Sequence, residues 1–157
     1  MISFAEAARR QQDYVVAMRR HFHMYPELGG EEFSTQRTIA TELEKIGLTP
    51  KLTAGTGVVA DLVGDSPGKM VALRADMDAL PIPDGKAVSY RSRNAGVCHA
   101  CGHDGHMAML LGEARVLTEM RRTLAGTVRF VFQPSEEKFP SGALAMIAEG
   151  AMTGVDH

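Results

Sequence analysis

The sequence has no marked excess of either charge and no long apolar run. Its 17 Lys and Arg residues nearly balance its 19 Asp and Glu residues, and the resulting net charge of −2 argues against nucleic acid or an anionic membrane as a partner. Apolar stretches such as Met107–Leu111 are far shorter than the roughly 20 residues that span a bilayer. The N-terminus has no uninterrupted apolar segment before a cleavage site, so we expect a cytoplasmic chain.

Cysteine is also scarce. Cys98 and Cys101 are three positions apart, so a disulfide between them would close a very short loop and constrain the unfolded chain little. Metal or redox chemistry is therefore the expected use of the pair. The remaining composition, with 45% hydrophobic and 23% charged residues, is typical of one ordinary globular domain of 157 residues.

Helical periodicity predicts four amphipathic helices. Their apolar stripes lie at Phe4–Phe22, Phe33–Ile46, Met107–Met120 and about Ala143–Glu149. Tyr25 and Pro26 follow the first helix as a stop signal, and Gly47 follows the second in the position of a left-handed cap.

Short β-branched or aliphatic runs predict three strands, at Gly57–Val63, Met70–Ala75 and Gly126–Phe132. The turn-forming segment Gly64–Gly68 separates the first two runs, which predicts that they pair as a hairpin. Residues 84–97 are polar without a clear period and predict a loop. Because strands and helices alternate after the hairpin, we expect an α/β domain with a layered mixed sheet flanked by helices.

Residues 98–106 (CHACGHDGH) hold two thiols, three imidazoles and a carboxylate in nine positions. In an extended Cys-x-His segment, Cys101 and His103 point to the same side, and Gly102 lets the backbone approach a bound ion closely. A thiolate with an imidazole favours a borderline-soft divalent ion such as zinc. We therefore predict Cys101 and His103 as metal ligands, whereas loop packing explains Cys98 and His99.

A structural zinc finger is the competing interpretation of this cluster. Its four nominal ligands would be Cys98, Cys101, His103 and His106. Finger sites separate their ligand pairs by about a dozen residues, so that the chain can wrap the ion. Four ligands this close can hardly all reach one tetrahedral centre, which favours a site completed by distant residues.

Glu136 and Glu137 are the obvious distant source of ligands. They follow the apolar run Val128–Phe132 closely, and the carboxyl ends of strands in open α/β sheets form ligand crevices. Adjacent carboxylates in an extended chain point to opposite sides, so one can bind metal while the other acts as a general base. A solvated acidic pair is the alternative, against which the preceding strand and the upstream cluster count.

Asp76 and Asp78 follow the run Met70–Ala75 in the same way. Two interpretations fit them equally: they ligate metal or orient a histidine, or they belong to an ordinary turn at a strand end. His21 and His23 have no partner that the sequence identifies, and structural packing is the expectation for both.

Four motifs occur in a characteristic order. They are Arg20–His23 (RHFH) with Pro26–Leu28 (PEL), Arg74–Ile82 (RADMDALPI), His99–His106 (HACGHDGH) and Phe132–Glu137 (FQPSEE). This series resembles the M20 family of metallopeptidases and amidohydrolases, in the branch of hippurate hydrolases, N-acyl-amino-acid amidohydrolases and indole-acetyl-amino-acid hydrolases. The resemblance extends from about Phe4 to Asp156.

The resemblance implies a catalytic domain with a zinc-aminopeptidase-like α/β fold and two divalent metal ions, manganese or zinc. On the matching positions, Cys101, His103 and Glu137 would be metal ligands, and Glu136 the catalytic acid/base. Members of the family cleave the amide of an N-acylated amino acid into a carboxylic acid and a free amino acid. That reaction suits ions that lower the pKa of water to about 7 and polarise a carbonyl.

The sequence is shorter than the family pattern. Family catalytic domains continue into a further strand with another His ligand, then into a smaller lid and dimerisation domain, and return to a last His. Residues 1–157 are accordingly expected to be the N-terminal part of the catalytic domain, without the lid. The segment Gly154–Asp156 matches a family segment that precedes the ligand by several more residues, so that role is not transferred to His157.

Two hypotheses follow. In the first, the chain is part of a homo-oligomeric amidohydrolase acting on small-molecule N-acyl amino acids, and the piece alone need not be active. In the second, it is a non-enzymatic metal-binding or interaction domain that oligomerises across an incomplete sheet edge. The motifs favour the first. The carboxylates suit manganese and the thiolate suits zinc, so the metal stays open between the two.

Overall fold

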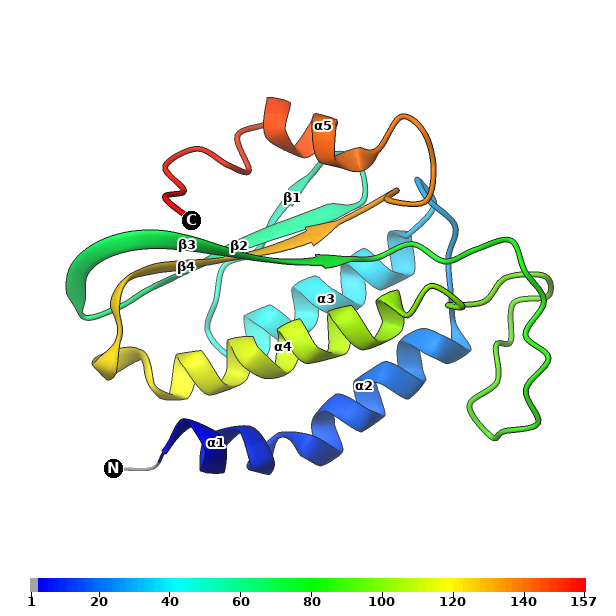
Figure 1. The fold of residues 1–157 in the computed structure, drawn as a ribbon, viewed down its shortest axis with the longest axis horizontal. Helices are drawn as coiled ribbons and strands as arrows, with labels where there is room; N and C mark the ends of the chain where they lie inside the picture. The colour runs from blue at the N-terminus through cyan, green and yellow to red at the C-terminus, as the bar shows by residue number, and fades with distance from the viewer. Residues whose placement is uncertain (1–2) are drawn as a thin grey trace.

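A four-stranded mixed sheet with helices on both faces forms the framework of the protein (Figure 1). The structure is a computed structural model and describes residues 3–157. In chain order the elements are α1 (Phe4–Arg10), α2 (Gln12–Met24), α3 (Phe33–Lys45), β1 (Lys51–Thr53), β2 (Gly57–Val63), β3 (Ser66–Asp76), α4 (His103–Glu119), the 3-10 turn η1 (Arg121–Thr123), β4 (Ala125–Gln133) and α5 (Gly142–Ala148). The expected α/β class with a mixed sheet is confirmed.

Strand β4 lies inside the sheet, whose order is β1-β2-β4-β3. It pairs antiparallel with β2 and parallel with β3. The predicted hairpin between Gly57–Val63 and Met70–Ala75 is therefore wrong, because β4 separates the two strands. Its inner position follows from its side chains, since Phe130 and Phe132 are buried in one hydrophobic core and Val131 in another.

Glycines let the connection between β2 and β3 cross the start of β4. The Gly64 N–H donates to the Gly126 carbonyl oxygen over 2.8 Å. A Cβ atom on Gly68 would lie 2.7 Å from the Gly126 nitrogen, and one on Gly126 would lie 2.0 Å from the Lys69 carbonyl oxygen. The glycine-rich segment thus permits a close approach of two backbones, a use that local sequence does not distinguish from a hairpin turn.

Helices α3 and α4 cover one face of the sheet, α2 packs against α4, and α5 covers the other face (Figure 1). The core between the sheet and these helices includes Phe22, Ile39, Leu43, Val58, Leu62, Met107, Leu111, Phe130 and Phe132. On the opposite face, Met146 of α5 packs with Val59 and Val131. No helix in the described part of the chain is long and apolar enough to cross a bilayer.

The predicted helix Phe4–Phe22 is divided at Gln11 into α1 and α2. Its two parts are buried in different places. Ala7 of α1 packs with Val116 and Met120 at the far end of α4, whereas Phe22 of α2 enters the main core. Burial in two separate clusters accounts for a break that the apolar periodicity alone does not reveal.

The parallel pairing of β3 and β4 positions the candidate site. Asp76 at the end of β3 lies opposite Gln133 at the end of β4. The segments that follow the two strands therefore meet at the carboxyl ends of β3 and β4, and α4 begins at the same end of the sheet (Figure 1).

Candidate metal centre

Three side chains with metal-ligating atoms converge at the carboxyl ends of β3 and β4. One ligand atom each from Cys101, His103 and Glu137 lies within 4.8 Å of the other two. A thiol sulfur, an imidazole nitrogen and a carboxylate oxygen are the donor types that zinc binds, so the residues present fit such an ion. The structure thus brings the three predicted ligands together, and their function as ligands stays a prediction.

The backbone reaches this arrangement differently from the extended chain that was expected. Gly102 has a φ of 93°, in the left-handed region that glycine adopts at low cost, and His103 opens α4. The segment with Glu136 and Glu137 is bent too, because the preceding Ser135 has a φ of 50°. Both expectations of extended backbone are wrong, since helix and bend formation at these positions depend on contacts with distant segments.

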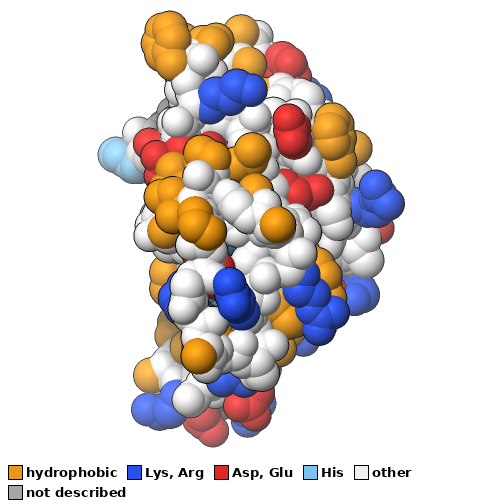
Figure 2. Space-filling model, turned by 90° about the vertical axis from the view of Figure 1, so that its right-hand side faces the viewer, with side chains coloured by type: hydrophobic (Ala, Val, Ile, Leu, Met, Phe, Trp, Pro, Cys, Tyr) orange, Lys and Arg blue, Asp and Glu red, His pale blue; other side chains and the backbone are white. Residues whose placement is uncertain are grey.

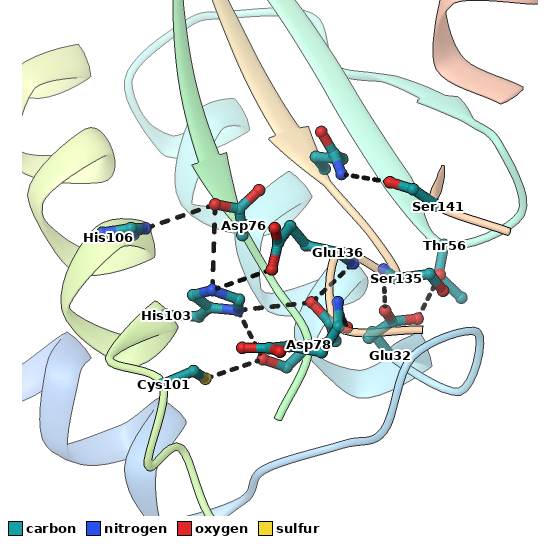
Figure 3. A network of polar contacts seen from close by, with 12 residues as sticks. Glu32, Thr56, Asp76, Asp78, Cys101, His103, His106, Ser135, Glu136 and Ser141 are labelled. Carbon is teal, nitrogen blue, oxygen red and sulfur yellow. Dashed lines mark hydrogen bonds and ion pairs between the residues drawn. The ribbon is translucent and has the colours of Figure 1, made fainter. Parts of the chain in front are cut away.

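Asp78 ties the ligand cluster to the segment that contains Glu136 and Glu137 (Figure 3). Its carboxylate accepts hydrogen bonds from the backbone N–H groups of Glu136 at 3.0 Å and Glu137 at 2.9 Å. Its carbonyl oxygen is 2.9 Å from His103 Nδ1. Because a carbonyl can only accept, His103 Nδ1 carries a proton and the ring orientation is defined. Of the two interpretations of Asp78, this geometry supports the one in which it orients a histidine.

These contacts change the proton affinity of the cluster. Burial alone would lower the pKa of His103, but hydrogen bonds with Asp78 and Cys101 raise this pKa to about 11. Burial would raise the pKa of Asp78, but hydrogen bonds from His103 and from the backbone lower it below its usual value. Without an ion, His103 therefore carries a positive charge at neutral pH, and an ion that binds its ring must displace a proton.

A second set of ligand-type side chains adjoins the first. Asp76, His103 and His106 also bring one ligand atom each within 4.8 Å of one another. The His106 ring stacks on the His103 ring, and His106 Nδ1 lies 3.6 Å from Asp76 Oδ2. Both sets use His103. The five side chains of the two sets therefore supply three ligands for one ion but not three separate ligands for each of two ions.

The cluster is open to solvent on one side. The side chains of His106 and Glu136 are 49% and 40% exposed, whereas that of His103 is 6% exposed. Figure 2 shows the end of the molecule toward which β3 and β4 point, with acidic, basic and apolar side chains on its surface. An open face of this kind lets a substrate reach the site.

His23 has partners that the sequence did not identify. Its Nδ1 lies 2.7 Å from Asp104 Oδ2, and its Nε2 lies 3.2 Å from Asp84 Oδ2. All three side chains are buried, and Asp104 also accepts a hydrogen bond from Arg19 Nε at 2.9 Å. His23 is thus buried inside the fold, as expected, but it lies in a polar network at the first turn of α4. His21, in contrast, lies against aromatic rings at the end of α2.

Cys98 belongs to this network and not to the metal-ligand cluster. With His23 and Asp84 it forms a third group of ligand-type atoms. The ammonium of Lys86 already lies at this group, with Nζ 3.2 Å from His23 Nε2, 3.6 Å from Asp84 Oδ1 and 3.9 Å from Cys98 Sγ. Burial raises the pKa of the Cys98 thiol. A protein cation therefore takes the place that a metal ion would need there.

Glu32, which no sequence pattern singles out, lies next to the candidate site. Its side chain is fully buried, and its Oε1 accepts a hydrogen bond from the Ser135 backbone N–H at 2.8 Å. Nothing in spacing or composition separates this glutamate from an ordinary acidic residue after Gly29 and Gly30. Its partner is 103 positions away, so only the folded chain reveals the contact.

Burial of His99 makes the stability of the fold depend on pH. The residue is 3% exposed, and within the described residues neither of its ring nitrogens has a hydrogen-bond partner. Burial lowers the pKa of His99 to about 4. The unfolded chain, with a pKa near 6.5, therefore binds more protons than the folded chain between these values, and the free energy of unfolding falls as pH falls.

We expect the metal-free wild type to lose on the order of 2 kcal/mol more stability than His99→Leu between pH 7.5 and pH 4.5. Urea denaturation of both proteins at the two pH values measures this difference. Equal losses in the two proteins would contradict the assignment of a neutral, buried His99.

Comparison with known proteins places the chain in a family. The family model that matches is described as Peptidase family M20/M25/M40, and it matches residues 72–157. The chain belongs to this family. The stretch contains Asp76 and Asp78, the cysteine and histidine cluster, and the two glutamates after β4.

Individual relatives share most of this chain but are much longer. The chain is 48% identical to an N-acyl-L-amino acid amidohydrolase of Geobacillus stearothermophilus over 143 residues, which are 90% of the chain and 39% of the relative. It is 48% identical to an IAA-amino acid hydrolase of Arabidopsis thaliana over 144 residues, 92% of the chain and 33% of the relative. The crystal structure of the Bacillus subtilis YXEP protein, described as a dinuclear metal binding peptidase from the M20 family, matches with a TM-score of 0.89 and 38% identity over 94% of the chain and 41% of that protein. The M20 chain thus spans about two fifths or less of these relatives.

Proposed function

We propose that the chain is the N-terminal part of the catalytic domain of a metal-dependent amidohydrolase, which cleaves N-acyl amino acids to a carboxylic acid and a free amino acid. One observation carries the proposal: Cys101, His103 and Glu137 converge within 4.8 Å, with Glu136 beside them, where parallel strands β3 and β4 end. Relatives named N-acyl-L-amino acid amidohydrolase and IAA-amino acid hydrolase support this choice of substrate class.

Glu136 is the residue that we expect to move the proton. Its Oε2 lies 3.9 Å from His103 Nε2, and its side chain is partly exposed, so the carboxylate borders both the ligand cluster and the open face. A bound divalent ion would supply a lowered pKa for water and polarisation of the amide carbonyl. Glu136 would take the proton from the attacking water and return it to the leaving amine. Glu137, whose backbone is held by the same Asp78, would hold the ion.

The residues of this chain fit one ion better than two. The two sets of ligand-type atoms share His103, and a zinc or manganese pair would need ligands from elsewhere in the complete enzyme. We expect calorimetric titration of the chain with Zn²⁺ or Mn²⁺ to give close to one ion per chain with a Kd of about 1 μM or weaker. Two tightly bound ions per chain would contradict this assignment.

The side of β3 that faces away from β4 supports assigning residues 1–157 to part of a larger catalytic domain. The Ala72 N–H donates to the His157 carbonyl oxygen at 2.8 Å, and the His157 N–H donates to the Met70 carbonyl oxygen at 3.3 Å. This is the hydrogen-bond pattern of a parallel pair, so the sheet can be extended at β3. We propose that the complete protein also has a lid and forms a homo-oligomer.

Release of free amino acid from a panel of N-acyl amino acids tests the proposed function. The chain should be loaded with Zn²⁺ or Mn²⁺ and complemented, that is, combined with the rest of the proposed catalytic domain and its lid. The complemented protein should hydrolyse at least one N-acyl amino acid of the panel, and a chelator should stop the reaction. β3 is an edge strand that pairs on its outer side only with the backbone near His157, and this favours one other candidate, a non-enzymatic metal-binding domain that oligomerises. Metal binding and self-association without hydrolysis in the complemented protein would support that candidate instead.

A further inference from the structure

Glu32 is a fully buried carboxylate between the chain segment before α3 and the segment after β4 (Figure 3). Its Oε1 accepts a hydrogen bond from the Ser135 N–H at 2.8 Å. Its Oε2 accepts one from the Gly30 N–H at 2.7 Å and one from the Thr56 hydroxyl at 2.5 Å. Both oxygens act as acceptors, as in an ionised carboxylate, and a buried carboxylate is tolerated only with partners of this kind.

Helix capping does not explain this side chain. Glu32 occupies the N-cap position of α3, where an acidic side chain normally bonds to the first turn, yet it makes no such bond. Glu27 does so instead and accepts hydrogen bonds from the backbone N–H groups of Ser34 at 3.1 Å and Thr35 at 2.8 Å. The carboxylate of Glu32 is therefore left for contacts outside the helix.

Ser135 is the partner that connects Glu32 to the candidate chemistry. Its φ of 50° lies in the left-handed region, which a residue with a Cβ atom rarely adopts without support. Glu32 holds its N–H, and Asp78 holds the next two N–H groups, those of Glu136 and Glu137. Three consecutive backbone amides are thus fixed by two buried carboxylates.

We propose that Glu32 is a positioning residue: it keeps Ser135 in its left-handed conformation and thereby directs the Glu136 carboxylate toward His103. The inference rests on the proposed function, in which Glu136 is the acid/base. Close packing supports it, because a Cβ atom on Gly29 would lie 3.1 Å from both Ser135 Oγ and Asp78 Oδ2. The segment before α3 therefore lies directly against the bend that carries Glu136.

The test compares Glu32→Gln with the matched control Glu27→Gln in isotope-labelled protein by NMR. Glutamine keeps the size of the side chain but replaces one accepting oxygen with an NH2 group, which cannot accept the hydrogen bonds made there, while Glu27→Gln alters the neighbouring cap without touching Ser135. In Glu32→Gln we expect exchange of the Ser135 amide proton to accelerate at least about tenfold. We also expect the nuclear Overhauser contact between the His103 ring and the Glu136 side chain to be lost. Glu27→Gln should leave both unchanged.

A folded Glu32→Gln protein with unchanged Ser135 exchange and an unchanged contact between His103 and Glu136 would overturn the proposal. If this variant does not fold, Thr56→Val removes one donor to the same carboxylate and should accelerate Ser135 exchange about threefold. No acceleration in Thr56→Val would then overturn it. Adding Ser135→Gly to Glu32→Gln should restore part of the contact, because glycine adopts the left-handed conformation without support.

Turnover in the complemented, metal-loaded enzyme separates this inference from the proposed function. We expect Glu32→Gln to lower kcat at least about tenfold with KM and metal content near the wild-type values. If the wild type releases no free amino acid in this assay, the proposed function fails. If Glu136→Gln abolishes turnover and Glu32→Gln leaves kcat unchanged, only the positioning role of Glu32 fails.

Discussion

Glu136→Gln is expected to lower hydrolysis of an N-acyl amino acid by about 10²- to 10⁴-fold while the metal content stays near the wild-type value. The amide cannot take a proton from water, but it keeps the size of the side chain that lies 3.9 Å from His103 Nε2. Glu137→Gln is expected to behave differently, because it removes a predicted ligand: metal content should fall and activity should fall with it. Amino acid release and elemental analysis of the purified variants measure the two effects.

An exposed glutamate elsewhere provides the control for this pair. Glu119→Gln, at the end of α4, changes the net charge by the same amount and should leave both turnover and metal content unchanged. Equal activity in Glu136→Gln and the wild type would remove Glu136 from the mechanism. Normal metal content in Glu137→Gln would remove Glu137 from the ligand set.

Asp78→Asn is expected to weaken metal binding about 10- to 100-fold and to lower the free energy of unfolding by about 2–4 kcal/mol. The Asp78 carboxylate accepts the N–H groups of Glu136 and Glu137, and its Oδ1 lies 3.4 Å from His103 Nδ1. An asparagine side chain offers one oxygen in place of two, so a buried N–H group loses its partner. Metal titration and urea denaturation test the two parts of the prediction.

The pH dependence of this contribution has a defined sign. The pKa of Asp78 is lower in the folded chain than its ordinary value, so its stabilising effect is present above that ordinary value and is lost as pH falls further. Asp65→Asn, an exposed change in the connection between β2 and β3, is the matched control and should alter neither property. Wild-type metal affinity in Asp78→Asn would contradict the organising role of Asp78.

Local patterns in the sequence predict most of the individual elements but not all of the strand pairing. The stripe in Met107–Met120 predicts most of α4, and the apolar run Gly126–Phe132 predicts β4, because each pattern reports burial of its own segment. The hairpin prediction fails because the partner of β2 is a strand more than 60 positions away, which turn residues at Gly64–Gly68 cannot indicate. The three-residue strand β1 is too short to leave a pattern.

The sequence likewise predicts some residues of the candidate site and not others. Cys101 and His103 can be selected because ligand-type residues are concentrated in one segment, and the pair Glu136 and Glu137 because it follows a buried strand. The choice of Glu137 as the ligand comes from the resemblance to the M20 family. Glu32 and His23 cannot be selected, since each is a single polar residue whose partner lies 103 or 81 positions away. Asp78, which also holds the ligands in place, is indicated by its position after a buried strand, whereas Glu32 and His23 are recognisable only from their contacts.

Binding of Co²⁺ as a substitute for zinc reports directly whether this chain holds an ion through Cys101, His103 and Glu137. Thiolate coordination gives a charge-transfer absorption, and the two cysteines make a matched pair of variants. We expect the wild type and Cys98→Ser to show this absorption and Cys101→Ser to lack it, because Cys101 lies in the ligand cluster and Cys98 lies beside Lys86. Loss of the absorption in Cys98→Ser with its retention in Cys101→Ser would show that Cys98, and not Cys101, binds the ion.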